Sequence, residues 1–288
     1  MSRLKNSQRA SGPKLLLKNT LSGLDQLNTT VVRNRILSDF GENPIWIPAG
    51  DLSTLSKSEI ESLSDGNLTL GPNIDWFNEE IAHIVSQLGQ VKVLVPHNWV
   101  LEPVTERLSL NSRVLVWQSG IDTDFWRNTK VRPQEVSVLI YLKNLTDVEN
   151  LELVENYLQK QGMRFTTVRY GFYTRSEYKS ILEGVTAAIW IGGTESQGLA
   201  LFECWSMNIP TLVLNRNTWF APNGNTYTAS SAPYMSEKEG MFSTSEVFSE
   251  SDFESFFSRL VNFSPRNNVR QNFNLKNCAS NLLQILNQ

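Results

Sequence analysis

The sequence is poor in cysteine, which argues against a small protein built on disulfides or on a cysteine metal site. Its only cysteines, Cys204 and Cys278, lie far apart and form no metal-binding spacing. A disulfide scaffold would carry more cysteines in a shorter chain. We therefore expect a protein of the reducing cytoplasm.

An excess of basic charge is also missing. The 26 lysines and arginines are outnumbered by 29 aspartates and glutamates, which gives a formal net charge of −3. A general nucleic-acid binder normally has a strong basic excess. Nucleic acid is therefore not an expected partner, and any anionic ligand must be held by a local arrangement of donors.

Long apolar runs are the third absence. No run approaches the length of about 18 residues that crosses a bilayer. The first ten residues are polar and lack the apolar centre of a signal peptide. The sequence predicts a soluble, cytoplasmic protein without a transmembrane segment, although peripheral contact with a membrane stays open.

What the chain does contain is an alternation of strand-like and helix-like segments. Its 288 residues, of which 40% are hydrophobic, can form one large domain or two smaller ones. Expected strands cover residues 45–48, 68–70, 91–95, 113–117, 136–141, 165–169, 187–191 and 211–214. Expected helices cover residues 13–27, 74–87, 148–159, 176–183, 197–207, 252–260 and 275–286, with a loop-rich region from 215 to 251. This alternation predicts an α/β protein with mostly parallel sheets.

A polar, turn-rich stretch at residues 118–133 separates two such α/β series. We place a domain boundary there, with domains at residues 1–120 and 121–288. The last helical segment could cross back to the first domain.

The segment after the strand at residues 187–191 is the most informative for chemistry. A loop leads from a buried strand into an apolar helix, and Gly198 lets the backbone come close to a ligand. N–H groups at a helix start, together with the helix dipole, can hold a diphosphate. The expected donors are the backbone groups of Ser196, Gln197, Gly198 and Leu199.

Two glutamates flank this proposed anion site. Glu195 precedes the helix, and Glu203 lies about five residues into it, roughly 7 Å further along. Carboxylates suit the vicinal diols of a sugar and a ribose because each accepts two hydrogen bonds. Two glutamates at this spacing also occur on many solvated helix faces, and the spacing alone would not indicate a site. The strand and the glycine turn that flank the pair favour the functional interpretation.

The segment resembles the Glu, seven residues, Glu signature of retaining GT-B glycosyltransferases. Residues 11–13, 95–100 and 117–126 are similar to that family's glycine loop, a first-domain segment and the linker between its domains. The resemblance implies a GT-B fold, in which two Rossmann-like domains face a cleft. Because 288 residues is short for that fold, we expect a reduced N-terminal domain.

The resemblance also implies roles for individual residues. Glu195 would contact the transferred sugar, Glu203 the donor's ribose, and Lys143 the diphosphate, which makes Glu195 and Lys143 the catalytic residues. An exposed lysine at a strand end is the alternative for Lys143. Gly171 and Tyr173 lie in the segment that corresponds to the family's base-binding loop, although core packing competes for its aromatic rings.

Other positions agree less well with the family. Gly12 and Asn73 are weak candidates for lining the cleft. The polar residues 1–10 stand where the family has a strand, and neither His83 nor His97 aligns with the family's first-domain histidine.

The implied activity is transfer of a sugar from a nucleotide-sugar donor to a glycan or small-molecule acceptor, as in polysaccharide biosynthesis. Retention of configuration and independence from metals and other cofactors are expected. Asp122 and Asp124 form a metal-type Asp-x-Asp pattern, but they lie in the interdomain linker. Alternatives are a non-catalytic nucleotide-sugar-binding or scaffolding protein and a nucleotide-sugar epimerase on the same fold.

Overall fold

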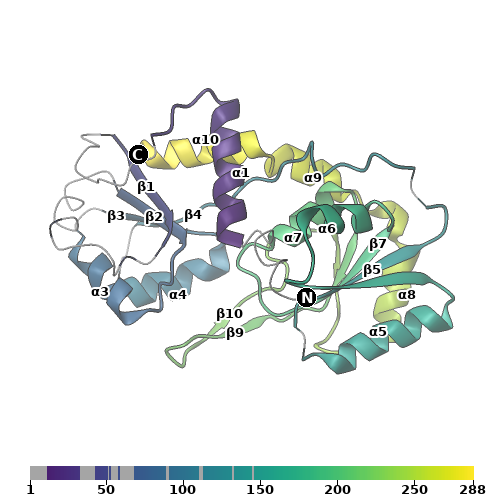
Figure 1. Ribbon diagram of the computed structural model, residues 1–288. Coiled ribbons are helices and arrows are strands. Elements are labelled where there is room, and N and C mark those ends of the chain that lie inside the picture. Colours follow the sequence, from purple (N-terminus) through teal and green to yellow (C-terminus); the bar gives the residue numbers. More distant parts are fainter. Residues whose placement is uncertain are drawn as a thin grey trace, which may run out of the picture. The chain divides into compact units, whose positions relative to one another are not determined.

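The chain forms two compact α/β units (Figure 1). The computed structural model describes residues 12–32, 43–50, 52, 58, 68–88, 91–109, 113–131, 133–144 and 146–288. Pro13–Gly120, Phe220–Tyr227 and Leu275–Gln288 belong to what we call the N-terminal unit. Ile121–Trp219 and Thr228–Asn274 belong to the C-terminal unit. Residues 1–10, where the sequence departs from the family, lie outside the described residues.

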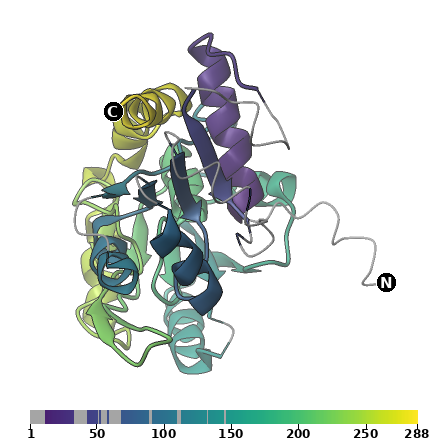
Figure 2. The ribbon, with the colours of Figure 1, turned by 90° about the vertical axis from the view of Figure 1, so that its left-hand side faces the viewer.

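The described part of the N-terminal unit contains a parallel sheet of four strands. Their order is β1 (Ile45–Ala49), β2 (Leu68–Asn73), β3 (Val91–Val95) and β4 (Val114–Val116). Helices α3 (Glu79–Gln87) and α4 (Asn98–Leu108) cover one face, and α1 (Gly12–Gln26) and α10 (Leu275–Leu286) cover the other (Figure 2). Buried valines and leucines of β2 and β3 fill the space between these layers.

Helix α10 is grouped with the N-terminal unit although it ends the chain. The Trp117 indole N–H donates to the Cys278 carbonyl at 2.9 Å, and Leu282 is buried in the same cluster. The Lys92 ammonium donates to the Ile285 carbonyl at 3.0 Å, which places a positive charge at the negative end of the helix. These contacts tie the last helix to β3 and to the end of the N-terminal sheet.

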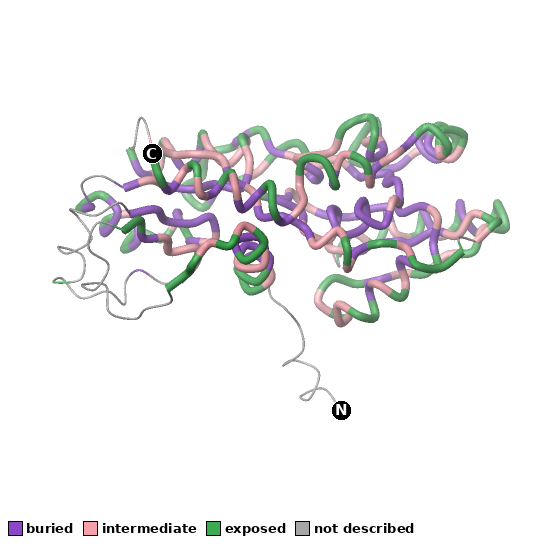
Figure 3. Tube along the Cα trace, turned by 90° about the horizontal axis from the view of Figure 1, so that it is seen from above, coloured by how far each residue is buried: buried purple, intermediate pink, exposed green. Residues whose placement is uncertain are grey.

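The C-terminal unit is built on a parallel five-stranded sheet. The strand order is β11 (Gly240–Phe242), β8 (Thr211–Val213), β7 (Ala187–Ile191), β5 (Ser137–Leu142) and β6 (Arg164–Arg169). Helices α6 (Arg175–Leu182), α7 (Leu199–Ser206) and α9 (Pro265–Asn272) pack on one face. Helices α5 (Val148–Lys160) and α8 (Glu250–Ser258) pack on the other. Strands β5, β7 and β8 are almost fully buried, whereas the edge strand β6 is partly exposed. Figure 3 draws the buried stretches of the chain in purple.

Local capping explains where two helices depart from their predicted starts. Helix α3 begins at Glu79 because the Asn78 side chain accepts hydrogen bonds from the Glu80 and Ile81 N–H groups, whereas the apolar pattern suggested residue 74. Helix α7 begins at Leu199 behind Gly198, two residues after the predicted start.

Several elements of the described chain were not predicted. Helix α4 contains Pro103, a residue that disfavours helix interiors. Strand β11 is three residues long and needs Gly240, because a Cβ there would lie 1.9 Å from the Thr211 carbonyl oxygen. Helix α9 is polar, and the hairpin of β9 (Thr218–Phe220) and β10 (Thr226–Thr228) lies within the region predicted as loop.

Part of this hairpin, Phe220–Tyr227, is grouped with the N-terminal unit rather than with the rest of residues 121–288. Within that unit the Tyr227 hydroxyl donates to Glu106 Oε2 on α4 at 2.7 Å. The packing of a hairpin tip on a helix has no signature in the sequence.

Candidate donor site

The carboxyl ends of β5 and β7 form one edge of the C-terminal sheet. Because the two strands pair in parallel, Lys143, which follows β5, lies next to the loop that follows β7. The Lys143 N–H donates to the Ile191 carbonyl at 2.8 Å. The Lys143 ammonium lies 2.6 Å from Glu195 Oε1. The structure thus brings together the two predicted catalytic residues.

Burial shapes the electrostatics of this ion pair. The Glu195 side chain is 11% exposed and that of Lys143 is 29% exposed. Burial raises the pKa of the Glu195 carboxyl, while the charge and hydrogen bond of Lys143 oppose that rise. An ammonium has three N–H donors, so Lys143 can bind a second anion while it holds Glu195.

Helix α7 begins beside this pair. Its N-cap, Gly198, is left-handed with φ 81° and provides no side-chain cap. A Cβ at Gly198 would approach the Leu201 Cδ1 to 3.2 Å. Among the first-turn N–H groups, that of Leu201 donates to the Gly198 carbonyl at 3.0 Å, whereas those of Leu199 and Ala200 precede any acceptor within the helix. At this terminus a ligand can approach the backbone closely and meets the positive end of the helix dipole. Ser196 and Gln197, which were predicted in the first helical turn, lie in the loop before it.

Glu203 lies in the second turn of α7 in a different environment from Glu195. The residue is 5% exposed, and its Oε1 atom has no hydrogen-bond partner. Burial raises the pKa of its carboxyl to about 8, while the charge of Arg175 opposes the rise. Glu203 therefore carries its proton near neutral pH and is a buried polar group with unused hydrogen-bonding capacity.

The aromatic residues after β6 divide between core and surface. Tyr173 is partly buried against the core, where its hydroxyl bonds that of Tyr141 at 2.6 Å and its ring stacks on Tyr178. Gly171 lies in the exposed turn between Tyr170 and Phe172. Tyr170 is 49% exposed, and the centre of its ring lies 5.3 Å from the Lys143 ammonium. Tyr170 is therefore the ring that faces the site.

The predicted base-binding segment begins at Tyr170, although Gly171 and Tyr173 were the residues named from it as donor-binding. Strands β5 and β6 pair in parallel with Leu142 opposite Arg169, so the next residues along, Lys143 and Tyr170, emerge side by side. The register could not be read from the sequence, because it depends on the pairing of the two strands.

Trp190 is a second residue that the sequence analysis did not single out. Its ring stacks on Tyr141 at 3.7 Å, and its indole N–H is buried without a hydrogen-bond partner. A Cβ at Gly192 would lie 3.7 Å from that nitrogen and 3.5 Å from the Lys143 Cβ. The indole N–H thus lies beneath the loop that leads to Glu195.

The remaining candidates are placed as follows. Gly12 is the first residue of α1, and Asn73 is the last residue of β2. That these two residues line a cleft stays a prediction. The Asp122 carboxylate accepts a hydrogen bond from the Phe125 N–H at 2.9 Å, which makes it part of a turn. His83 lies on α3 near Gln87, and His97 caps α4.

The described residues contain no group of three or more His, Cys, Asp or Glu side chains arranged to hold a metal ion. No helix of the described chain is both long and apolar enough to cross a membrane.

Comparison with known proteins identifies the fold. No protein-family model and no curated protein sequence matches the chain. Among solved structures, Anabaena HepE in complex with UDP and glucose matches with TM-score 0.55 and 9% identity, covering 98% of this chain and 97% of HepE. AviGT4, a glycosyltransferase of avilamycin A biosynthesis, matches with TM-score 0.51 and 8% identity, over 97% of this chain and 90% of its own.

WaaG, a glycosyltransferase of lipopolysaccharide biosynthesis, matches with TM-score 0.50 and 11% identity, covering 96% of each chain. At such low identity these matches show the fold alone. The chain has the GT-B fold, as the sequence resemblance implied.

Proposed function

We propose that this chain is a retaining glycosyltransferase that moves a sugar from a nucleotide-sugar donor to a glycan or small-molecule acceptor. The observation that carries the proposal is the arrangement at one sheet edge of the Lys143–Glu195 ion pair, the start of α7 and the buried carboxyl of Glu203. The structures of similar fold support it, since two are named as glycosyltransferases and HepE is named as a complex with UDP and glucose.

The proposed mechanism depends on charge that develops when the sugar leaves. As the bond between the anomeric carbon and the diphosphate oxygen breaks, its electrons move to the diphosphate. Lys143 and the N–H groups at the start of α7 offset that negative charge. The acceptor hydroxyl forms the new bond to the anomeric carbon and transfers its proton to the departing diphosphate.

The two glutamates have separate roles in this proposal. Glu195 is held by Lys143 at 2.6 Å and orients the hydroxyls of the transferred sugar. Glu203, which carries no hydrogen bond on Oε1, binds the hydroxyls of the donor's ribose. Retention of configuration follows from the sequence resemblance. We propose that no metal is needed, because Lys143 and the helix dipole supply the positive charge and Asp122 is used by a turn.

A thermal-shift screen tests the proposal. Sugars linked to UDP, GDP, ADP and TDP are compared with the same free sugars and the matching nucleosides. Because a ligand that binds only the folded state stabilises it, we expect one nucleotide series to raise Tm. If no nucleotide sugar or nucleoside diphosphate raises Tm, the proposal is wrong.

Product analysis then separates the alternatives. A transferase releases the nucleoside diphosphate and needs an acceptor, whereas an epimerase converts the donor without one. Binding without either product would identify the non-catalytic alternative.

A further inference from the structure

A second set of polar contacts at the same sheet edge connects the segment after Lys143 to the backbone of Glu195. These contacts begin just after Lys143. The Asn144 side chain accepts hydrogen bonds from the Thr146 N–H at 3.2 Å and from its hydroxyl at 2.8 Å. The Asp147 N–H donates to the Asn144 carbonyl at 3.3 Å. Asp147 is thereby fixed relative to the end of β5.

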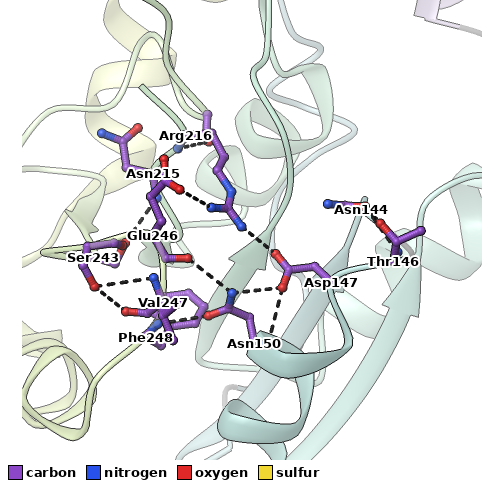
Figure 4. Close-up of polar contacts among 12 residues, drawn as sticks. Asn144, Thr146, Asp147, Asn150, Asn215, Arg216, Ser243, Glu246, Val247 and Phe248 are labelled. Carbon is purple, nitrogen blue, oxygen red and sulfur yellow. Dashed lines mark hydrogen bonds and ion pairs between the residues drawn. The ribbon is translucent and has the colours of Figure 1, made fainter. Parts of the chain in front are cut away.

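Asp147 connects this segment to the end of β8. One of its carboxylate oxygens lies 3.0 Å from Arg216 Nη2, and the other accepts from the Asn150 side chain at 2.9 Å as Asp147 caps α5 (Figure 4). The Asp147 side chain is 8% exposed and that of Arg216 is 26% exposed. A partly buried pair of this kind is screened less than a surface pair.

Arg216 leads back to Glu195 through two adjacent serines. The Arg216 backbone N–H donates to the Ser231 hydroxyl at 2.7 Å, and Ser231 is fully buried. The carbonyl of the preceding residue, Ser230, accepts from the Glu195 N–H at 2.8 Å. A closed ring of contacts therefore runs from Lys143 through Asp147, Arg216 and Ser231 to Glu195, and the Lys143–Glu195 ion pair closes it.

Arg216 itself is a poor candidate for binding the donor's phosphates. Its guanidinium lies between Asp147 and Glu246, at 3.0 and 3.1 Å, so two carboxylates compensate its single charge (Figure 4). Glu246 is 66% exposed, whereas Asp147 is nearly buried. The stronger restraint therefore acts through Asp147.

We propose that Arg216 is a positioning residue. Its guanidinium holds Asp147, and its backbone N–H holds Ser231, next to the Ser230 carbonyl that binds the Glu195 N–H, so Arg216 sets Lys143 relative to Glu195. The inference rests on the proposed function, in which Lys143 binds the donor's diphosphate. Loss of the Arg216 side chain would allow the segment that carries Lys143 to move relative to Glu195. Binding of the diphosphate would weaken, and binding of the nucleoside would not.

The test compares UDP with uridine, or the corresponding pair for the base that the thermal-shift screen selects. The Kd of uridine divided by the Kd of UDP, both measured by calorimetry, with displacement titrations for the weaker ligand, reports what the diphosphate adds to binding. We expect Arg216→Gln to reduce this ratio about fivefold, as for residues coupled through shared contacts. Arg216→Lys should restore most of it, and uridine affinity should stay unchanged.

Matched variants separate positioning from general destabilisation. Asp147→Asn keeps a good helix cap but weakens the ion pair, so it should match Arg216→Gln. Glu246→Gln should change the ratio less than about twofold, because this exposed pair contributes little. Arg164→Gln, which removes an exposed ion pair on β6, should have no effect. Combined with Lys143→Met, Arg216→Gln should add no further loss.

Each result has a distinct meaning. If wild-type protein binds UDP no better than uridine, the proposed diphosphate site is wrong and this inference fails with it. If the wild-type ratio is large and Arg216→Gln retains it, or if uridine affinity falls equally, the positioning role alone is wrong. If Arg216→Gln does not fold, an unchanged ratio in Asp147→Asn overturns the inference.

Discussion

Glu195 and Glu203 lie eight positions apart and are both buried, but the fold gives only Glu195 an ion-pair partner. Glu195 shares its charge with Lys143, whereas Glu203 Oε1 is buried without a hydrogen bond. The sequence predicted both positions, because a strand, a glycine turn and an apolar helix frame them. It could not predict their protonation, because burial depends on Tyr141, Tyr173 and other residues that the sheet brings over α7.

The raised pKa of Glu203 predicts a pH-dependent stability. The folded protein keeps a proton up to a pKa of about 8 that the unfolded chain releases near 4.5. The free energy of unfolding should therefore fall as the pH rises through this window, by at most about 1.4 kcal/mol per pH unit. Glu203→Gln cannot ionise and should lack this slope. Urea denaturation at pH 5, 6, 7 and 8 measures the difference.

The control for this measurement is Glu254→Gln, which changes an exposed carboxyl on α8. It should keep the wild-type slope. Parallel pH profiles for wild type and Glu203→Gln would show that Glu203 is not the buried, protonated group.

Gly198 provides a second prediction at this scale. Alanine there must adopt φ 81° and place its Cβ 3.2 Å from Leu201 Cδ1. We expect Gly198→Ala to lower the free energy of unfolding by about 1–2 kcal/mol. Gly193→Ala is the matched control in the same loop, because nothing lies within 4 Å of a Cβ there. Equal effects in chemical denaturation would argue against a strained turn at Gly198.

At the scale of elements, the sequence predicted those helices and strands whose apolar residues follow a clear period. Most strands of both sheets and helices α1, α5, α6, α8 and α10 lie where expected, within a few residues. The misses have physical causes. Pro103 argues against a helix where α4 forms, and the three residues of β11 pair with β8, which Gly240 approaches closely. Tertiary contacts of this kind leave no local pattern.

The packing of α10 yields a prediction for stability. Leu282 is fully buried beside Leu94 and Trp117, although its helix ends the chain. Leu282→Ala should lower the free energy of unfolding by about 3 kcal/mol, the usual cost of a cavity in a core. Gln284→Ala, an exposed position on the same helix, should change it by less than about 0.5 kcal/mol. Similar effects of both variants on urea denaturation would show that α10 is not packed as described.

At the scale of the whole molecule, the sequence predicted an α/β chain with a division near residue 120, and the contacts divide it at Gly120 and Ile121. The residues proposed to bind the donor come from Ile121–Asn274 alone. The return of Leu275–Gln288 and the grouping of Phe220–Tyr227 depend on long-range packing. Only the first of these had a hint in the sequence.

A metal-independent reaction is a prediction for the intact protein. With a donor identified by the screen, a chelator should leave the release of nucleoside diphosphate unchanged, because Lys143 and the start of α7 supply the positive charge. The assay is run with and without EDTA and with added Mg²⁺ or Mn²⁺. Turnover that disappears with EDTA and returns with the metal would contradict this prediction.

The most direct test of the donor site is calorimetric titration of the selected nucleoside diphosphate into wild type, Glu195→Gln and Glu203→Gln. Glu203 is proposed to bind the ribose through a protonated carboxyl, so Glu203→Gln should weaken binding about tenfold, the upper end for a lost hydrogen bond between neutral groups. Glu195 is proposed to contact only the sugar, and a glutamine side chain still accepts a hydrogen bond from the Lys143 ammonium and keeps it in place, so Glu195→Gln should keep the affinity within about threefold. Equal loss of affinity in both variants, or unchanged affinity in Glu203→Gln, would contradict the account.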